Sequence, residues 1–180
     1  SGSETLLDQN RRALQMAGMP ESETNNYCRF LADAYEAVVN DMPLPSPDNY
    51  CLPAGLKQNA FMLSASLKTP YMKYFLGMNV SDILGSVKCP VMALNGTKDT
   101  QVDCDRNLSL LRQGLSGGYT FADESSVNVV KAEIGLNHLF QHCRTGEVSE
   151  YKEIEETFSP DVLTEMITWL QSPLIAKLIK

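Results

Sequence analysis

The chain has 180 residues, enough for one domain or for one and a half, and a compact domain of this size can bury a core without a metal ion or a disulfide to hold it. Its 15 basic and 22 acidic residues give a net charge of −7. That charge argues against a nucleic-acid partner and against an anionic membrane, because both bind basic surfaces. No apolar run approaches the roughly 20 residues of a membrane span. The composition therefore predicts a soluble, acidic, globular protein.

The cysteines argue against a fold stabilised by a zinc site and against one stabilised by disulfides. The chain has five cysteines, an odd number, and no pair is spaced as CxxC. Neither a zinc site of ordinary spacing nor a complete disulfide framework is therefore expected. No signal peptide is visible at Ser1, although Ser1 could be an internal point of a longer protein. The compartment stays open, and the parent protein could be periplasmic or extracellular.

The first half of the chain is expected to be helical. Residues 3–18 predict a helix with Ser3 as its cap, and residues 22–40 predict a second helix with an apolar stripe. Three prolines then predict a loop that ends near residue 53. A third helix is indicated by apolar residues at helical spacing, which are Leu56, Ala60, Leu63 and Leu67. A short helical turn is expected at 71–76.

From residue 90 the pattern changes to strand, helix, strand, helix. An apolar run at 91–94 and a β-rich run at 127–134 are expected to be strands, with a helix over 103–114 between them. Ser159-Pro160 predicts the start of the last helix, with the serine as cap and the proline in the first turn. The apolar face of that helix carries Leu163, Met166, Ile167 and Leu170.

A strand–helix–strand unit of this length implies two parallel strands, so the expected fold class is α/β. Two strands alone do not make a stable buried parallel sheet. The remaining strands of the sheet must come from elsewhere, because no other segment of the sequence predicts one.

Two side chains suited to acid–base chemistry follow the two expected strands. Asp99 lies in the loop after the first strand, and His138 lies in the loop after the second. Because parallel strands end at the same edge of a sheet, both residues are expected at one edge, where α/β enzymes place their chemistry. An acid that orients a histidine, and a histidine that takes a proton from a nucleophile, need this arrangement.

Each residue also has a plain structural interpretation. Asp99 could be an ordinary turn aspartate, since aspartate is a favoured turn residue. His138 could be a hydrogen-bonded structural histidine. Two suitable residues at two consecutive strand ends favour the functional interpretation of the pair.

Several segments resemble α/β-hydrolases. Residues 89–102 read Cys-Pro-Val-Met-Ala-Leu-Asn-Gly-Thr-Lys-Asp-Thr-Gln-Val. They resemble the acid-bearing strand end of the prolyl oligopeptidase-like and dipeptidyl peptidase-like esterases, with the pattern C-P-x-x-x-x-x-G-x-x-D-x-x-V. Residues 134–141 resemble the histidine loop of that group. The stretch from Glu150 to Pro160, then Trp169, resembles the C-terminal region of its bacterial members, and residues 3–9 resemble the stretch just after the nucleophile-bearing half.

The resemblance implies that Asp99 is the triad acid and His138 the triad base of a serine hydrolase that acts on carboxylic esters or peptide-like substrates. Residues 1–85 would be a helical cap or lid, and residues 86–180 the C-terminal strand–helix–strand–helix part of the hydrolase core. No cofactor and no metal are expected. The partners are a small substrate and the N-terminal half of the same hydrolase. A homo-oligomer could also form through the open sheet edge.

The family needs a serine in G-x-S-x-G, on a turn from a strand into a helix and before the acid in the chain. One literal match occurs at 114–118, with Ser116 at its centre. It follows a helix and precedes a strand, and it comes after Asp99, so a glycine-rich helix end is the favoured interpretation. Asp123 as an alternative acid would lie at the opposite edge of the sheet. The nucleophile is therefore expected outside this chain, and the chain alone is expected to be inactive.

Three other patterns have plain interpretations. His138 and His142 are four residues apart but lack the carboxylate frame of a helical metal site. Cys143 next to His142 is expected to be an ordinary thiol, since adjacent residues rarely meet as base and nucleophile. A solvated face is expected for the glutamates Glu147, Glu150, Glu153, Glu155 and Glu156.

A second function stays open, a non-catalytic binding or interaction module with a hydrolase-like fold. In that case the helical half would form a partner surface, and Asp99 and His138 would be structural. The two interpretations differ in one geometric requirement. The hydrolase needs the Asp99 carboxylate within hydrogen-bond reach of the His138 ring.

Overall fold

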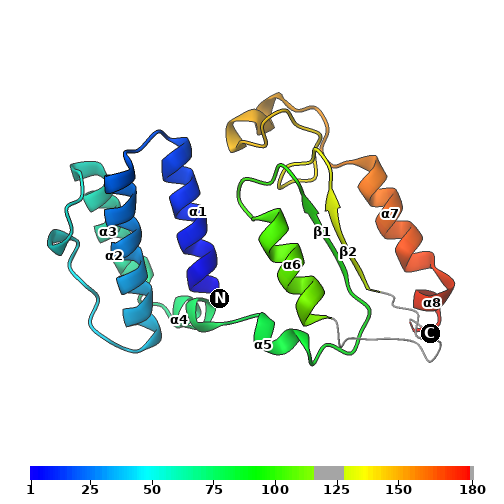
Figure 1. Ribbon diagram of the computed structural model, residues 1–180, viewed down its shortest axis with the longest axis horizontal. Coiled ribbons are helices and arrows are strands. Elements are labelled where there is room, and N and C mark those ends of the chain that lie inside the picture. The colour runs from blue at the N-terminus through cyan, green and yellow to red at the C-terminus, as the bar shows by residue number, and fades with distance from the viewer. Residues whose placement is uncertain (116–127, 179–180) are drawn as a thin grey trace. The chain divides into compact units, whose positions relative to one another are not determined.

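Two units make up the chain, Ser1–Val80 and Ser81–Lys180 (Figure 1). The structure is a computed structural model that describes residues 1–115 and 128–178. The first unit contains only helices, whereas the second combines helices with a small parallel sheet. The chain is therefore α/β in the loose sense, as the change of pattern near residue 90 predicted.

The first unit contains four α-helices. Their bounds are α1 Gly2–Met16, α2 Glu21–Val39, α3 Ala54–Ser66 and α4 Pro70–Gly77, with a 3-10 turn at Pro47–Asn49. The core is centred on the apolar stripe of α2, where Phe30, Leu31 and Ala34 are fully buried. Leu67, at the end of α3, and Leu76, in α4, complete this core. The predicted helices and their apolar stripes are confirmed here.

The start of α1 differs from the expected one. Ser1 caps the helix, because its hydroxyl accepts a hydrogen bond from the Glu4 N–H at 3.3 Å and the Glu4 side chain binds back to the Ser1 amino group. This reciprocal pairing needs a glutamate three residues after the cap, and Ser1 meets that requirement. The prediction of Ser3 as the cap is wrong: its hydroxyl donates to the Leu76 carbonyl at 2.8 Å and ties α1 to α4.

The second unit contains two strands and four helices among its described residues. Their bounds are α5 Ser81–Leu84, β1 Met92–Gly96, α6 Cys104–Gly114, β2 Val129–Glu133, α7 Pro160–Gln171 and α8 Pro173–Ala176, with a 3-10 turn at Val148–Glu153. The strands β1 and β2 are parallel, in a register that runs from Met92 opposite Val129 to Gly96 opposite Glu133. Helix α6 connects them and packs on both (Figure 1).

The two outer edges of this sheet differ. The Val129 N–H donates to Val91 O, and the Thr97 N–H donates to Glu133 O, both at 2.9 Å. Because alternate residues of a parallel strand face the same neighbour, the backbone of Met92 and Leu94 faces away from β2, and no described strand pairs with it. At the outer edge of β2, Arg112 of α6 donates to Val130 O at 3.0 Å. The sheet is thus open for pairing along β1.

Helix α7 begins at Pro160, as predicted, but without the predicted cap. Ser159 is buried, and its hydroxyl has no hydrogen-bond partner in the described structure, so the prediction of a capping serine is wrong. The backbone fixes this position instead, since the Ser159 N–H donates to Phe140 O at 2.8 Å. None of the described helices is both long enough and apolar enough to cross a membrane.

The predicted apolar face of α7 is largely uncovered. Val162 is buried, at 2% exposure, but the four residues expected on the apolar face are between 40% and 52% exposed. They are Leu163, Met166, Ile167 and Leu170.

Candidate active site

The site lies where the two parallel strands end. After β1 the chain forms an acid loop, residues 97–102, and after β2 it forms a histidine loop, residues 134–142. The backbone joins the two loops directly, because the Lys98 N–H donates to Leu136 O at 3.0 Å. The Gly135 N–H also donates to the Thr97 hydroxyl at 2.9 Å. The expected meeting of the two loops at one edge is therefore observed.

Gly96 allows this close approach. A Cβ atom at Gly96 would lie 2.2 Å from Leu136 O and 2.7 Å from Asn137 O, and real side chains do not approach backbone oxygens so closely. The histidine loop therefore packs against bare backbone at the end of β1. Any larger residue at position 96 would push that loop outward.

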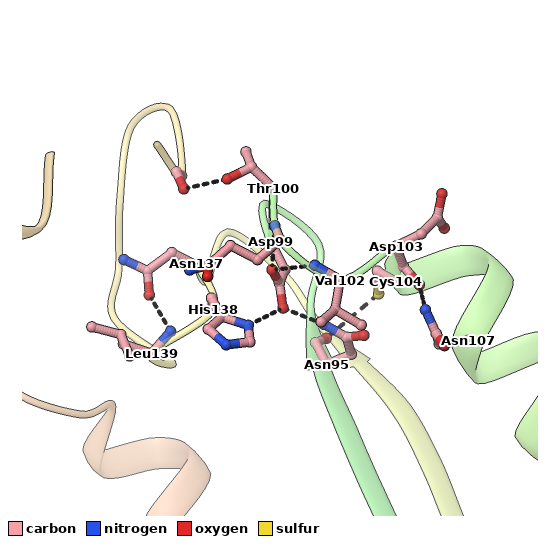
Figure 2. Close-up of polar contacts among 12 residues, drawn as sticks. Asn95, Asp99, Thr100, Val102, Asp103, Cys104, Asn107, Asn137, His138 and Leu139 are labelled. Carbon is pink, nitrogen blue, oxygen red and sulfur yellow. Dashed lines mark hydrogen bonds and ion pairs between the residues drawn. The ribbon is translucent and has the colours of Figure 1, made fainter. Parts of the chain in front are cut away.

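The acid loop holds Asp99 through both carboxylate oxygens (Figure 2). Oδ1 accepts hydrogen bonds from the N–H groups of Gln101 and Val102, each at 2.9 Å. Oδ2 accepts a hydrogen bond from the Asn95 side-chain amide, also at 2.9 Å. The Asp99 side chain is only 4% exposed, so these three donors replace the water that burial removes. Asp99 is thus a turn aspartate whose second oxygen can accept a further hydrogen bond beside the one from Asn95.

That second oxygen faces the histidine. His138 Nδ1 lies 2.9 Å from Asp99 Oδ2, and Figure 2 shows the ring turned edge-on toward the carboxylate. Because a carboxylate only accepts hydrogen bonds, Nδ1 carries the proton and Nε2 of the neutral ring is the proton acceptor. The His138 side chain is 38% exposed, and no described residue hydrogen-bonds to Nε2. The ring is therefore oriented through Nδ1 and partly exposed.

The histidine loop is organised around Asn137, which is fully buried. Its side-chain oxygen accepts from the N–H groups of Leu139 at 2.9 Å and Gln141 at 3.0 Å, while its amide donates to Gln141 Oε1 at 3.0 Å. Phe140 has a positive φ of 56°, which allows the chain to turn back sharply. These bonds fix the backbone on both sides of His138 and thereby the direction of its ring.

A third segment, residues 143–151, is joined to the acid loop. Lys98 Nζ donates to Cys143 O at 2.8 Å and to Arg144 O at 2.9 Å. The hydroxyl of Thr100 donates to Gly146 O at 3.1 Å, and the Gln101 side-chain amide donates to the Tyr151 hydroxyl at 2.9 Å. The residues next to Asp99 therefore connect the acid loop to the chain that follows the histidine loop.

The Glu150 carboxylate stabilises the turn at residues 144–146, which receives these contacts. The hydroxyl and N–H of Thr145 donate to its carboxylate, as do the N–H groups of Arg144 and Gly146, at distances between 2.7 and 3.0 Å. These donors lower the pKa of Glu150 from 4.5 to about 2. The expectation of a merely solvated face is therefore wrong for Glu150. Its carboxylate stays ionised and hydrogen-bonded over the pH range in which most proteins are folded.

Glu156 departs from the same expectation. It accepts a hydrogen bond from the His142 N–H at 2.5 Å, and its carboxylate lies 2.9 Å from His142 Nδ1. The backbone donor lowers the pKa of the Glu156 carboxyl, with a smaller contribution from the His142 side chain. His142 thus faces a carboxylate on the outer side of the loop, while His138 faces Asp99.

The two cysteines nearest the site are held as thiols. Cys104 is buried with its Sγ 3.5 Å from Asn95 O, and Cys143 has its Sγ 3.4 Å from Gly135 O. Burial raises the pKa of both thiols, which disfavours the nucleophilic thiolate. This agrees with the interpretation of Cys143 as an ordinary thiol.

The literal G-x-S-x-G match gives no alternative site in the described structure. Ser116 and Asp123 lie outside the described residues. Gly114 ends α6, and a Cβ there would lie 2.4 Å from Leu84 Cδ1 and 2.7 Å from Leu84 Cβ. Close packing of α5 on α6 is therefore a sufficient reason for the first glycine of the match.

The structure brings together both residues that the sequence indicates and adds four that sequence reasoning missed. The additional residues are Asn95, Lys98, Asn137 and Glu150. The two asparagines stand at a strand end and beside His138, and asparagine favours side chain-to-backbone hydrogen bonds in loops. That preference is the sequence signal from which Asn95 and Asn137 could have been predicted. Lys98 contacts carbonyls 45 and 46 residues away, for which the sequence holds no local signal. Glu150 binds N–H groups four to six residues before it, in a turn that the run of glutamates did not indicate.

Chemically, the site is one half of a proton-transfer system. It holds a buried acid and an oriented, partly exposed imidazole, an arrangement that can take a proton from a hydroxyl placed next to Nε2. No described side chain supplies that hydroxyl. No protein-family model, curated protein or solved structure matches the chain.

Proposed function

We propose that this chain supplies the acid and the base of an α/β-hydrolase that acts on carboxylic esters, with the nucleophilic serine and the oxyanion hole supplied by a segment N-terminal to it. The observation that carries the proposal is the 2.9 Å contact between Asp99 Oδ2 and His138 Nδ1, in a histidine whose side chain is 38% exposed.

The roles follow from the geometry. Asp99 holds the tautomer in which His138 Nε2 accepts a proton, and it stabilises the imidazolium that forms. His138 would take the serine proton as the serine oxygen attacks the ester carbonyl. It would then return that proton to the leaving alcohol, and in the second half-reaction activate water in the same way.

The incomplete sheet supports a missing segment. The free edge of β1 presents the backbone of Met92 and Leu94, whereas the outer edge of β2 is partly occupied by Arg112. A strand from an N-terminal segment would pair with β1, which would make β2 the last strand of the sheet. Both strands are only partly buried over most of their length, as expected for a sheet that lacks neighbours.

The distribution of buried apolar residues supports the same proposal. In the described part of the chain, the cluster of buried hydrophobic residues lies in the first unit, between Tyr27 and Leu76. The second unit leaves the apolar face of α7 between 40% and 52% exposed. The second unit also buries single hydrophobic residues such as Leu108, Leu136 and Val162, and additional strands and helices would cover the apolar residues that it leaves exposed. In this proposal, the helices of the first unit form the cap of the hydrolase.

Ester hydrolysis tests the proposal. The chain alone is expected to show no turnover of a short p-nitrophenyl ester, and a longer protein that includes an upstream G-x-S-x-G turn is expected to hydrolyse it. Serine-dependent hydrolysis by the chain alone that is lost in Ser116→Ala would contradict the proposal and would assign the nucleophile to the match at 114–118.

A further inference from the structure

A groove in the first unit contains none of the residues of the candidate active site. Its volume is about 660 Å³, within the range of small-molecule sites, and it lies between the end of α2, the loop after it and the turn from α3 into α4. Its accessible apolar lining is formed by Val38, Met42 and Leu44, and the buried side chains of Ala37 and Leu67 lie beneath them. The groove therefore offers an apolar lining that rests on the core of the first unit.

The walls of the groove are fixed by local structure. Helix α2 ends with the Met42 N–H bonded to Ala37 O at 2.8 Å, and Asp41 adopts a positive φ of 55° in this helix end. On the opposite wall, Thr69 caps α4 by accepting from the Met72 N–H, and Pro70 occupies the first turn of that helix. The groove is thus preformed and does not need a loop to fold around a ligand.

The rim of the groove carries a positive charge excess. Three charged residues line it: Lys68, Lys73 and Asp41. Lys73 forms an ion pair with Asp41, whereas Lys68 has no acidic partner among the described residues. Lys68 is therefore a cation without an acidic partner beside the apolar lining of the groove, although the chain as a whole carries a net charge of −7.

We propose that this groove binds a medium-chain carboxylate, with the hydrocarbon chain against Val38, Met42 and Leu44 and the carboxylate beside Lys68. The ion pair between Lys73 and Asp41 has a defined role in this proposal. Asp41 is the competing anion at the rim, so its removal frees Lys73 for the ligand. The proposal needs only residues of the first unit and does not depend on the hydrolase proposal.

The experiment is a titration of the isotope-labelled chain with octanoate, followed by the NMR signals of the groove methyl groups. Octanoate is expected to shift the methyl signals of Val38, Met42 and Leu44, and octylammonium is expected to bind more weakly. Lys68→Ala is expected to raise the Kd for octanoate about fivefold, the upper range for an exposed ion pair. Asp41→Asn is expected to lower it about threefold, because asparagine also adopts a positive φ but carries no charge.

Two matched variants separate local from overall charge effects. Lys57 and Asp48 form an ion pair in the same unit at 3.2 Å and do not line the groove. Lys57→Ala and Asp48→Asn make the same charge changes and are expected to leave the Kd within a factor of 1.5. The proposal is overturned if 10 mM octanoate leaves the groove methyl signals unshifted, if octylammonium binds as tightly as octanoate, or if the matched variants change the Kd as much as Lys68→Ala and Asp41→Asn do.

Discussion

Replacing His138 by alanine is expected to lower kcat/KM for a p-nitrophenyl ester by roughly 10⁶-fold in a longer protein that carries the upstream serine turn. The serine hydroxyl would then lack its proton acceptor. Replacing Asp99 by asparagine is expected to lower kcat/KM by about 10⁴-fold. An asparagine can donate a hydrogen bond to His138 Nδ1 and so favours the tautomer with the proton on Nε2, which cannot act as the base.

The second histidine provides the matched control. His142 is the only other histidine, lies in the same loop and also has Nδ1 near a carboxylate, that of Glu156. His142→Ala keeps the backbone N–H that binds Glu156 and is expected to retain the rate within about tenfold. Equal losses in His138→Ala and His142→Ala, or full activity in Asp99→Asn, would refute the assignment of acid and base.

Replacing Gly96 by alanine is expected to destabilise the second unit by about 3 kcal/mol, at the upper end of the usual cost of overpacking. The new Cβ would lie 2.2 Å from Leu136 O and 2.7 Å from Asn137 O, and both are backbone atoms that cannot turn aside. Relief requires the histidine loop to move away from β1, which also breaks the backbone bond from Lys98 to Leu136. Urea unfolding followed by tryptophan fluorescence measures the effect, because Trp169 is the only tryptophan and lies in the second unit.

Gly85→Ala is the control for that measurement. Gly85 lies in the same unit, and a Cβ there would have no atom within 4 Å. Its substitution is expected to change the free energy of unfolding by less than about 0.5 kcal/mol. Equal shifts of the unfolding midpoint in Gly96→Ala and Gly85→Ala would contradict the close packing of the histidine loop on β1.

The meeting of Asp99 and His138 could be predicted because it depends on one general property of folds. Parallel strands that follow each other in the chain end at the same edge, so residues just past two such strands are brought together whatever the intervening sequence. The helices of the first unit could be predicted for a similar reason, since the apolar stripe of α2 repeats at helical spacing.

Contacts that depend on tertiary structure could not be predicted. Lys98 binds carbonyls more than 40 positions away, which no local pattern indicates. The Glu150 contacts are local, because its partners lie four to six residues before it, but the turn at 144–146 that places three N–H groups around it has no clear sequence pattern. The predictions of Ser3 and Ser159 as helix caps were wrong for a related reason. Ser159 has the right residue type for a cap, but its position is fixed by the backbone bond to Phe140.

The most direct test of the central claim is the reaction of the longer protein with a fluorophosphonate, followed by mass-spectrometric identification of the modified serine. The account predicts one modified serine, in a G-x-S-x-G turn upstream of this chain, with labelling abolished in His138→Ala. Modification of Ser116, or labelling that persists at the full rate without His138, would contradict it.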